Sequence, residues 1–201
     1  IALAIKLDDT ASPVMYNAPR VGKDLRVFKM YKFRTMKPAF EGAGRVTAGT
    51  LTRPGRVLRK TSLDELPQLL NILKGDMSFV GPRPLTERYV PWYTAEQNLR
   101  HSVRPGLTGL AQISGRVNLR WDKRFECDVR YVHSLSFGQD LRIFLATVRK
   151  ALGGDDALAD DSDTESFDYF DDFQRDRLAR GLVSASDLIG RPDLLAKGTS
   201  D

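Results

Sequence analysis

The hydrophobic pattern of the first quarter of the chain predicts a short helix, a strand and a loop. Residues 1–5 are entirely apolar and lead into charged positions, as at the last turns of an apolar helix that reaches water. In residues 27–36, large apolar side chains are interleaved with Lys29, Lys32 and Arg34, which is typical of a strand with one cationic, solvent-exposed face. Residues 40–52 are poor in large apolar groups and rich in glycine and threonine, so we expect a loop there.

Four leucines at helical spacing predict a helix that ends at Gly75. Ahead of them, Ser62 and Glu65 fit the spacing of a capping box. Pro67 is poorly placed inside a helix begun at Ser62, because proline removes a backbone donor. The helix therefore either starts nearer Pro67 or is kinked there, and in both cases Asp64 and Glu65 lie at a positive helix end that favours ionised carboxylates.

Two stiff arginine turns follow. Residues 77–80 read as a short apolar strand that leads into the Gly-Pro-Arg-Pro turn at 81–84. The flanking prolines hold Arg83 in an extended conformation, which prepares its planar guanidinium for a phosphate at little entropic cost. A second Arg-Pro turn at 104–109 leads through three glycines to Arg116, and such glycines allow close backbone approach to a ligand.

Residues 88–101 mix aromatic and basic side chains, and two interpretations stay open: an amphipathic helix at a membrane interface, or a helix that faces the core. Residues 122–133 and 141–152 predict two further helices. Residues 173–182 and 185–195 also have helical spacing, and we interpret them as a small helical annex.

Charge is divided unequally along the chain. Residues 1–150 hold 26 basic and 13 acidic side chains, a net charge of +13, whereas residues 151–201 hold 5 and 13, a net charge of −8. Residues 155–172 carry nine acids and no base, which is linker composition. We therefore divide the chain into a basic body at 1–152, an acidic linker at 153–172 and the annex at 173–201.

Composition excludes several classes of protein. With 201 residues, 41% of them hydrophobic, the chain is large enough for one globular core and is not disordered. Cys127 is the only cysteine, which excludes a disulfide framework and a cysteine-based zinc site. No run approaches the ~20 apolar residues of a spanning helix, and the G-x-x-x-x-G-K-[ST] loop of nucleotide kinases is missing.

Four motifs in order along the chain resemble the bacterial sugar transferases, the monotopic phosphoglycosyl transferases. They are YKFRTM at 31–36, LDELPQ at 63–68, GPRP at 81–84 and RPGLTG at 104–109. The resemblance covers residues 1–152. It implies an α+β fold class, a helix-rich monotopic membrane-associated catalytic domain with a few short strands and amphipathic interfacial helices, to which this chain adds the annex.

Members of this family transfer a sugar 1-phosphate from a UDP-sugar to polyprenyl phosphate and release UMP. The resemblance implies UDP-sugar and polyprenyl (undecaprenyl) phosphate as substrates and Mg²⁺ as cofactor. It implies the cytoplasmic face of the bacterial inner membrane as the location, and the first membrane step of exopolysaccharide, O-antigen or glycoprotein assembly as the role. No nucleic-acid partner is expected, and the sugar and a homo-oligomeric state are left open.

The same resemblance assigns the site residues. Asp64 would be the nucleophile that forms a covalent acyl phosphate with the sugar phosphate, and it would also be the magnesium ligand. Glu65 would assist metal binding or proton handling. Cationic side chains would neutralise the phosphates so that a carboxylate can approach phosphorus; the candidates are Arg59, Arg83, Arg104 and Arg116, with Lys32 and Arg34 on the basic strand.

Two departures from the family and two alternatives accompany this interpretation. Family members usually carry a hydrophobic re-entrant helix ahead of the Ile1 segment, and we expect that helix to be missing from this sequence. Near residues 16–22 the family commonly has a glutamine where this chain has Ala18 or its neighbours, so nucleotide contacts there are left unassigned. The alternatives are a basic nucleic-acid-binding module and a catalytically inert membrane-associated scaffold.

Overall fold

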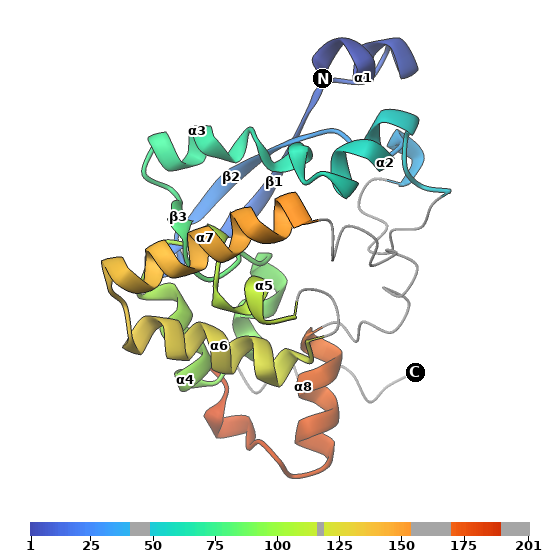
Figure 1. Cartoon of the computed structure of the whole chain (residues 1–201). Helices are drawn as coiled ribbons and strands as arrows, with labels where there is room; N and C mark the ends of the chain where they lie inside the picture. The colour runs from blue at the N-terminus through green and yellow to red at the C-terminus, as the bar shows by residue number, and fades with distance from the viewer. Residues whose placement is uncertain (41–48, 116–118, 154–169, 190–201) are drawn as a thin grey trace, which may run out of the picture.

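The computed structural model describes residues 1–40, 49–115, 119–153 and 170–189 (Figure 1). In the first half of the chain, an antiparallel hairpin is surrounded by short helices and pairs Ala18 with Met30 at its centre. The elements are α1 (Ala2–Asp8), β1 (Met15–Val21), η1 (Lys23–Leu25), β2 (Val27–Phe33), η2 (Pro38–Phe40), α2 (Arg53–Lys60), η3 (Leu63–Glu65) and α3 (Gln68–Leu73).

The second half of the chain is mainly helical, with one short parallel strand pair. Its elements are β3 (Ser78–Val80), η4 (Glu87–Trp92), α4 (Ala95–Asn98), η5 (Leu99–His101), β4 (Gly106–Thr108), α5 (Leu110–Gly115), α6 (Trp121–His133), α7 (Phe137–Gly153), α8 (Phe170–Ala179) and η7 (Ala185–Asp187). Helices with a few short strands confirm the α+β expectation.

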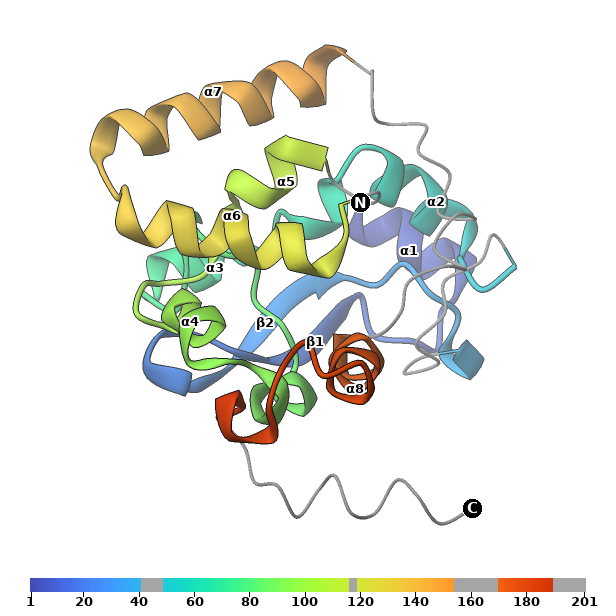
Figure 2. The same cartoon turned by 90° about the horizontal axis from the view of Figure 1, so that it is seen from below.

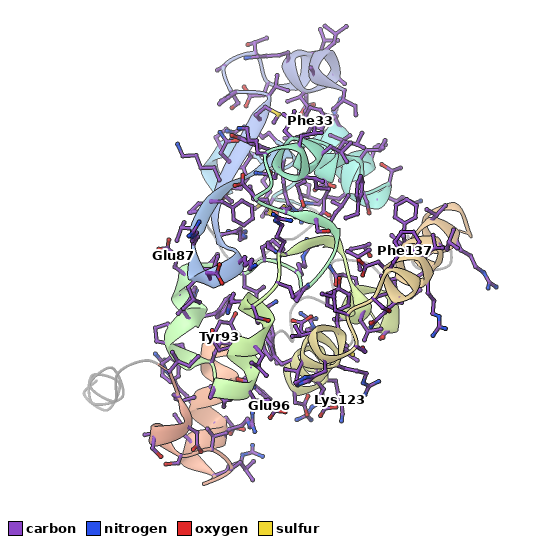
Figure 3. All side chains as sticks on the ribbon, turned by 90° about the vertical axis from the view of Figure 1, so that its left-hand side faces the viewer. Phe33, Glu87, Tyr93, Glu96, Lys123 and Phe137 are labelled. Carbon is purple, nitrogen blue, oxygen red and sulfur yellow. The ribbon has the colours of Figure 1, made fainter. Side chains whose placement is uncertain are left out.

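Two groups of buried side chains hold the helices together. Val80, Tyr131 and Ile143 join β3 to α6 and α7. Trp92, Tyr93 and Phe125 form the second group, between η4 and α6. Figure 1 shows α1, α2 and α3 at one end of the molecule and α8 at the other, and Figure 2 shows the same elements from below. In the side-chain view, Phe33 of β2 and Tyr93 lie in opposite halves (Figure 3).

The aromatic segment at 88–101 faces the core. Trp92 is 7% exposed and Tyr93 only 1%, so the core-facing alternative is right and the membrane-interface alternative is wrong for these side chains. The helices predicted at 122–133 and 141–152 are α6 and α7, although α7 begins at Phe137. The strand predicted over 27–36 ends at Phe33, and the loop expected at 40–52 lies largely outside the described residues.

The chain between α2 and α3 does not form the predicted capping box. Ser62 adopts a left-handed backbone conformation with φ 56° and makes no side-chain cap hydrogen bond. A single 3-10 turn follows, and α3 begins after Pro67, so the alternative of a helix start near Pro67 is the right one. Gly75 ends the segment with φ 82°, a conformation that glycine adopts without steric cost.

α3 turns its polar side inwards. Gln68 and Asn71 are buried, at 2% and 0% exposure. The Asn71 amide nitrogen donates to the Lys29 carbonyl at 2.8 Å, and its side-chain oxygen accepts from the Tyr31 backbone N–H at 3.0 Å. Asn71 therefore pairs with the edge of β2 as another strand would, and the leucines of α3 point away from the protein.

Candidate active site

The turn between α2 and α3 presents the two acidic residues of the site. Thr52 caps α2, because its hydroxyl accepts from the Gly55 N–H at 3.0 Å. Gly55 lies so close to Thr35 that an added Cβ would come 2.1 Å from the Thr35 carbonyl oxygen. α2 is thus locked against the chain that follows β2, and η3 places Asp64 in a buried position beside it, 7% exposed.

Glu65 is held by two cations. Its Oε1 accepts from Lys32 Nζ of β2 and from Arg83 Nη2 of the Gly-Pro-Arg-Pro turn, each at 2.7 Å. Burial alone would raise the pKa of Glu65, but the charges and hydrogen bonds of Arg83 and Lys32 outweigh it and hold that pKa far below its ordinary value. Glu65 is therefore an ionised link between two of the sequence motifs.

Asp64 differs from its neighbour. It makes no hydrogen bond or ion pair with any residue in the described part of the chain. Burial raises the pKa of Asp64, and the charge of Lys32 opposes that shift. One carboxylate of the pair is thus occupied by cations, and the other lies beside the same cations with its oxygens uncommitted.

The two Arg-Pro turns lie side by side because β3 and β4 pair in parallel. The Gly81 N–H donates to the Thr108 carbonyl at 2.9 Å, and the Gly106 N–H donates to the Pro82 carbonyl at 3.0 Å. A Cβ on Gly106 would come 2.1 Å from the Gly81 nitrogen, so this approach requires glycine. Gly106 and Gly109, two of the three glycines expected to approach a ligand, lie against the backbone of Gly81.

The other basic residues expected at the site are placed differently. Arg59 Nε donates to the Thr35 hydroxyl at 3.0 Å, and Coulomb interaction with Arg59 acts on Asp64. Arg104 is exposed on the turn next to Gly81. Arg34 is buried, and its Nε donates to the Pro13 carbonyl at 2.7 Å. Arg116 lies outside the described residues, and the phosphate-binding roles of all four stay predictions.

Two further cations near Arg83 were missed from the sequence. Burial lowers the pKa of both Arg20 and Arg124, and the like charge of Arg83 adds to the shift in each case. Arg124 also lines a pocket together with Arg83, Arg100, Gln112 and other residues. Arg20 and Arg124 lie 63 and 41 positions from Arg83 in the sequence, so only the tertiary fold could reveal them.

A divalent cation could be held here only in part by protein groups. Among the described residues, no group of three His, Cys, Asp or Glu side chains is arranged to hold a metal. Mg²⁺ is commonly bound by one or two carboxylates together with substrate phosphates, and Asp64 has free oxygens for such a role. The donor set therefore fits a magnesium ion shared between Asp64 and a phosphorylated substrate.

The site adjoins an exposed apolar surface. We call this surface the leucine face; it comprises exposed side chains of η3, α3, β3 and the link between η3 and α3, namely Leu63, Leu66, Leu69, Leu70, Leu73 and Phe79. The Phe79 ring packs edge-on against the Phe144 ring of α7, with 6.1 Å between the ring centroids. Leu141 and Leu145 of α7 are also exposed. Such surfaces mark contacts with partners or membranes. No helix in the described ranges is long and apolar enough to cross a membrane.

Comparisons with known proteins agree with the motifs. The family described as bacterial sugar transferase matches residues 1–154. An uncharacterized sugar transferase of Bacillus subtilis, EpsL, is 52% identical over 70% of this chain and 71% of its own length. Proteins named UDP-glucose:undecaprenyl-phosphate glucose-1-phosphate transferase, from Caulobacter vibrioides and Escherichia coli, are each 41% identical. They align with 78% and 75% of this chain, which spans 62% and 35% of their respective lengths.

Proposed function

Because the chain belongs to the bacterial sugar transferase family, we propose that it transfers a sugar 1-phosphate from a UDP-sugar to polyprenyl phosphate. The observation that carries the proposal is the unequal carboxylate pair, in which Glu65 is held by Lys32 and Arg83 while Asp64 is uncommitted. The names of the Caulobacter and Escherichia relatives describe the same class of reaction.

The reaction proceeds in two displacements at phosphorus. A carboxylate oxygen of Asp64 attacks the phosphorus attached to the sugar, the bond from that phosphorus to the bridging oxygen breaks, and UMP leaves with the electron pair. The product is an aspartyl phosphosugar. A phosphate oxygen of the polyprenyl acceptor then attacks the same phosphorus, which forms the polyprenyl diphosphate sugar and restores the Asp64 carboxylate.

The surrounding cations make the first displacement electrostatically feasible. An anionic carboxylate is repelled by a diphosphate unless positive charge is already in place. Arg83 is 46% exposed at its side chain while it contacts Glu65, so part of its guanidinium faces outward and is available to a phosphate oxygen. Glu65 holds that guanidinium beside Asp64, Lys32 binds the same Glu65 oxygen, and Arg59 approaches from α2. A magnesium ion bound by Asp64 and the phosphates would withdraw further negative charge.

The leucine face suits the second substrate. Leu63 and Leu66 flank the two acidic residues in sequence and are 38% and 44% exposed. Contact of this face with lipid would bring the membrane surface, and the phosphate of a polyprenyl acceptor embedded in it, next to Asp64. The basic body would add attraction to anionic headgroups of the cytoplasmic leaflet.

Transfer to vesicles that contain polyprenyl phosphate tests the proposal. The chain, incubated with magnesium, vesicles and a panel of UDP-sugars, is expected to release UMP and to place the sugar on the lipid. Asp64→Asn is expected to abolish both products, whereas Glu96→Gln, an exposed acid on α4, is expected to retain them. Equal turnover by Asp64→Asn and the wild type would exclude the mechanism.

A further inference from the structure

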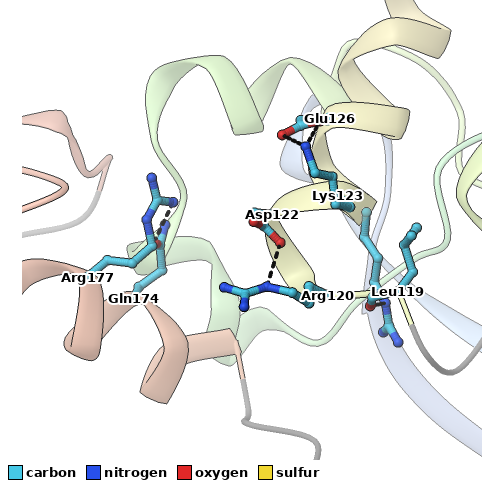
Figure 4. Close-up of polar contacts among 8 residues, drawn as sticks. Leu119, Arg120, Asp122, Lys123, Glu126, Gln174 and Arg177 are labelled. Atoms are coloured by element: carbon cyan, nitrogen blue, oxygen red, sulfur yellow. Dashed lines mark hydrogen bonds and ion pairs between the residues drawn. The ribbon is translucent and has the colours of Figure 1, made fainter.

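The described part of the annex, from Phe173 of α8 through η7 to Ile189, lies outside the family match and is nevertheless anchored in the core. Gln174 of α8 is completely buried, and its amide nitrogen donates to the Trp92 carbonyl at 2.8 Å and to Gln97 Oε1 at 2.9 Å. Its own oxygen accepts from Arg177 at 3.2 Å (Figure 4). The buried Gln174 amide makes all of these hydrogen bonds, and the loss of any partner would leave a buried polar atom unsatisfied. Gln174 therefore attaches α8 to the core at one specific position.

A second attachment follows along the chain. Leu188 and Thr94 form an isolated antiparallel β-bridge, and the Ile189 N–H donates to the Tyr93 carbonyl at 2.8 Å. Phe173, Leu178 and Leu188 also pack against the Trp92, Tyr93 and Phe125 cluster. The annex therefore holds the backbone of residues 92–94 and the side chain of Gln97 at two separate attachments.

From Tyr93 the contacts continue to the active site. The guanidinium of Arg100, 4% exposed, donates to the Tyr93 hydroxyl at 2.9 Å and to Asp128 Oδ2 at 3.0 Å. It also donates to the Arg83 carbonyl at 2.6 Å. Arg83 in turn contacts Glu65 at 2.7 Å. All three bonds of Arg100 are charge-assisted, so its position is strongly determined.

We propose that the annex is a clamp on the active site, which positions Arg83 through Tyr93 and Arg100. The inference rests on the proposed function, in which Arg83 meets a substrate phosphate. Arg100 is a positioning residue, because it contacts the Arg83 backbone and not the guanidinium, which binds Glu65 and is partly exposed. When the clamp loosens, the Gly-Pro-Arg-Pro turn loses a support on its carbonyl side, and small displacements of such a group reduce rates strongly.

One substitution on α8 and one directly after this helix test the clamp in the full chain. Gln174→Ala removes the bonds to Trp92 and Gln97, whereas Arg180→Ala removes only an exposed pair with Asp176 and serves as the matched control. Amide hydrogen exchange is measured over residues 78–90 and 93–101, and UMP release is measured at saturating UDP-sugar. Gln174→Ala is expected to speed exchange in both segments and to slow UMP release on the order of tenfold, while Arg180→Ala changes neither.

Tyr93→Phe provides a milder test that preserves the aromatic packing against Phe125 and removes only the hydroxyl bonded to Arg100. The same exchange increase at 78–90, with a lower kcat and a melting temperature that falls by only a few degrees, supports the clamp. Exchange that rises only within 92–98 and 170–189, or Gln174→Ala kinetics equal to those of Arg180→Ala, overturns it. If the wild type releases no UMP, the proposed function fails, and the exchange data alone decide whether the annex supports the Arg83 turn.

Discussion

At the scale of single residues, two adjacent carboxylates have opposite environments. Glu65 accepts from two cations and has a depressed pKa, whereas Asp64 is buried without a hydrogen-bond partner among the described residues and has a raised pKa. The sequence could place both acids near a positive helix end, but it could not tell which would be engaged, because Lys32 and Arg83 reach Glu65 from distant segments.

Asp64→Asn separates stability from activity. Burial disfavours the charge on Asp64, so its removal is expected to leave the melting temperature equal to or above that of the wild type. UMP release is expected to fall at least about 10³-fold, because the nucleophile is lost. Thermal unfolding and UMP release measured on the same sample check this. A variant that is both inactive and markedly less stable would contradict the account.

Glu65→Gln is expected to have the opposite effect on stability. It leaves Lys32 and Arg83 without their charged partner, which at neutral pH costs roughly 1–3 kcal/mol of unfolding free energy. Because the pKa of Glu65 is depressed in the folded state, its stabilisation is complete above the ordinary value of 4.5 and is lost as the pH falls below it. Denaturant unfolding between pH 3.5 and 7 should therefore show a difference that shrinks in acid. A difference independent of pH would refute the ion-pair assignment.

At the scale of elements, α3 shows what periodicity can and cannot predict. The leucine spacing correctly indicates a helix, but amphipathic spacing alone does not say which side faces the protein. The buried side is set by Asn71, which pairs with the edge of β2, and by Gln68. The aromatic stretch at 88–101 shows the converse, because an amphipathic segment suited to a membrane surface is buried by α6 and the annex.

The leucine face should bind lipid without contributing to folding. Leu69 and Leu73 are 39% and 83% exposed, so the double change to glutamine is expected to leave the melting temperature within a few degrees of the wild type. Sedimentation with anionic vesicles is expected to fall several-fold, because apolar area available to the interface is lost. Leu182→Gln, an exposed leucine after α8, is the control. Equal sedimentation of the two variants would exclude the face from lipid contact.

At the scale of the whole molecule, two strand pairs bring together motifs that lie far apart in the sequence. β2 supplies Lys32, and the parallel contact of β3 with β4 brings the two Arg-Pro turns together. Three of the four motifs supply the side chains that the structure brings together, Lys32, Asp64, Glu65 and Arg83, and the roles assigned to these residues stay predictions. Arg20, Arg124 and the Arg100 network could not be predicted, because no local pattern distinguishes them from other arginines of a basic body.

The unequal division of charge along the chain is also a property of the whole molecule. The excess positive charge of residues 1–150 includes the cations around Asp64, whereas most of the acidic run lies outside the described residues. The part of the C-terminal segment that is described folds back onto the body through Gln174 and Leu188. Such an attachment could not be read from spacing, since the helical pattern of α8 does not identify its partner.

Mass spectrometry of the chain after incubation with UDP-sugar and magnesium, without acceptor lipid, tests the central claim most directly. The account predicts a phosphosugar adduct on the peptide that carries Asp64, with at most one UMP released per chain and no adduct in Asp64→Asn. UMP release that requires the acceptor and leaves no adduct, or an adduct on another residue, would contradict the role assigned to Asp64.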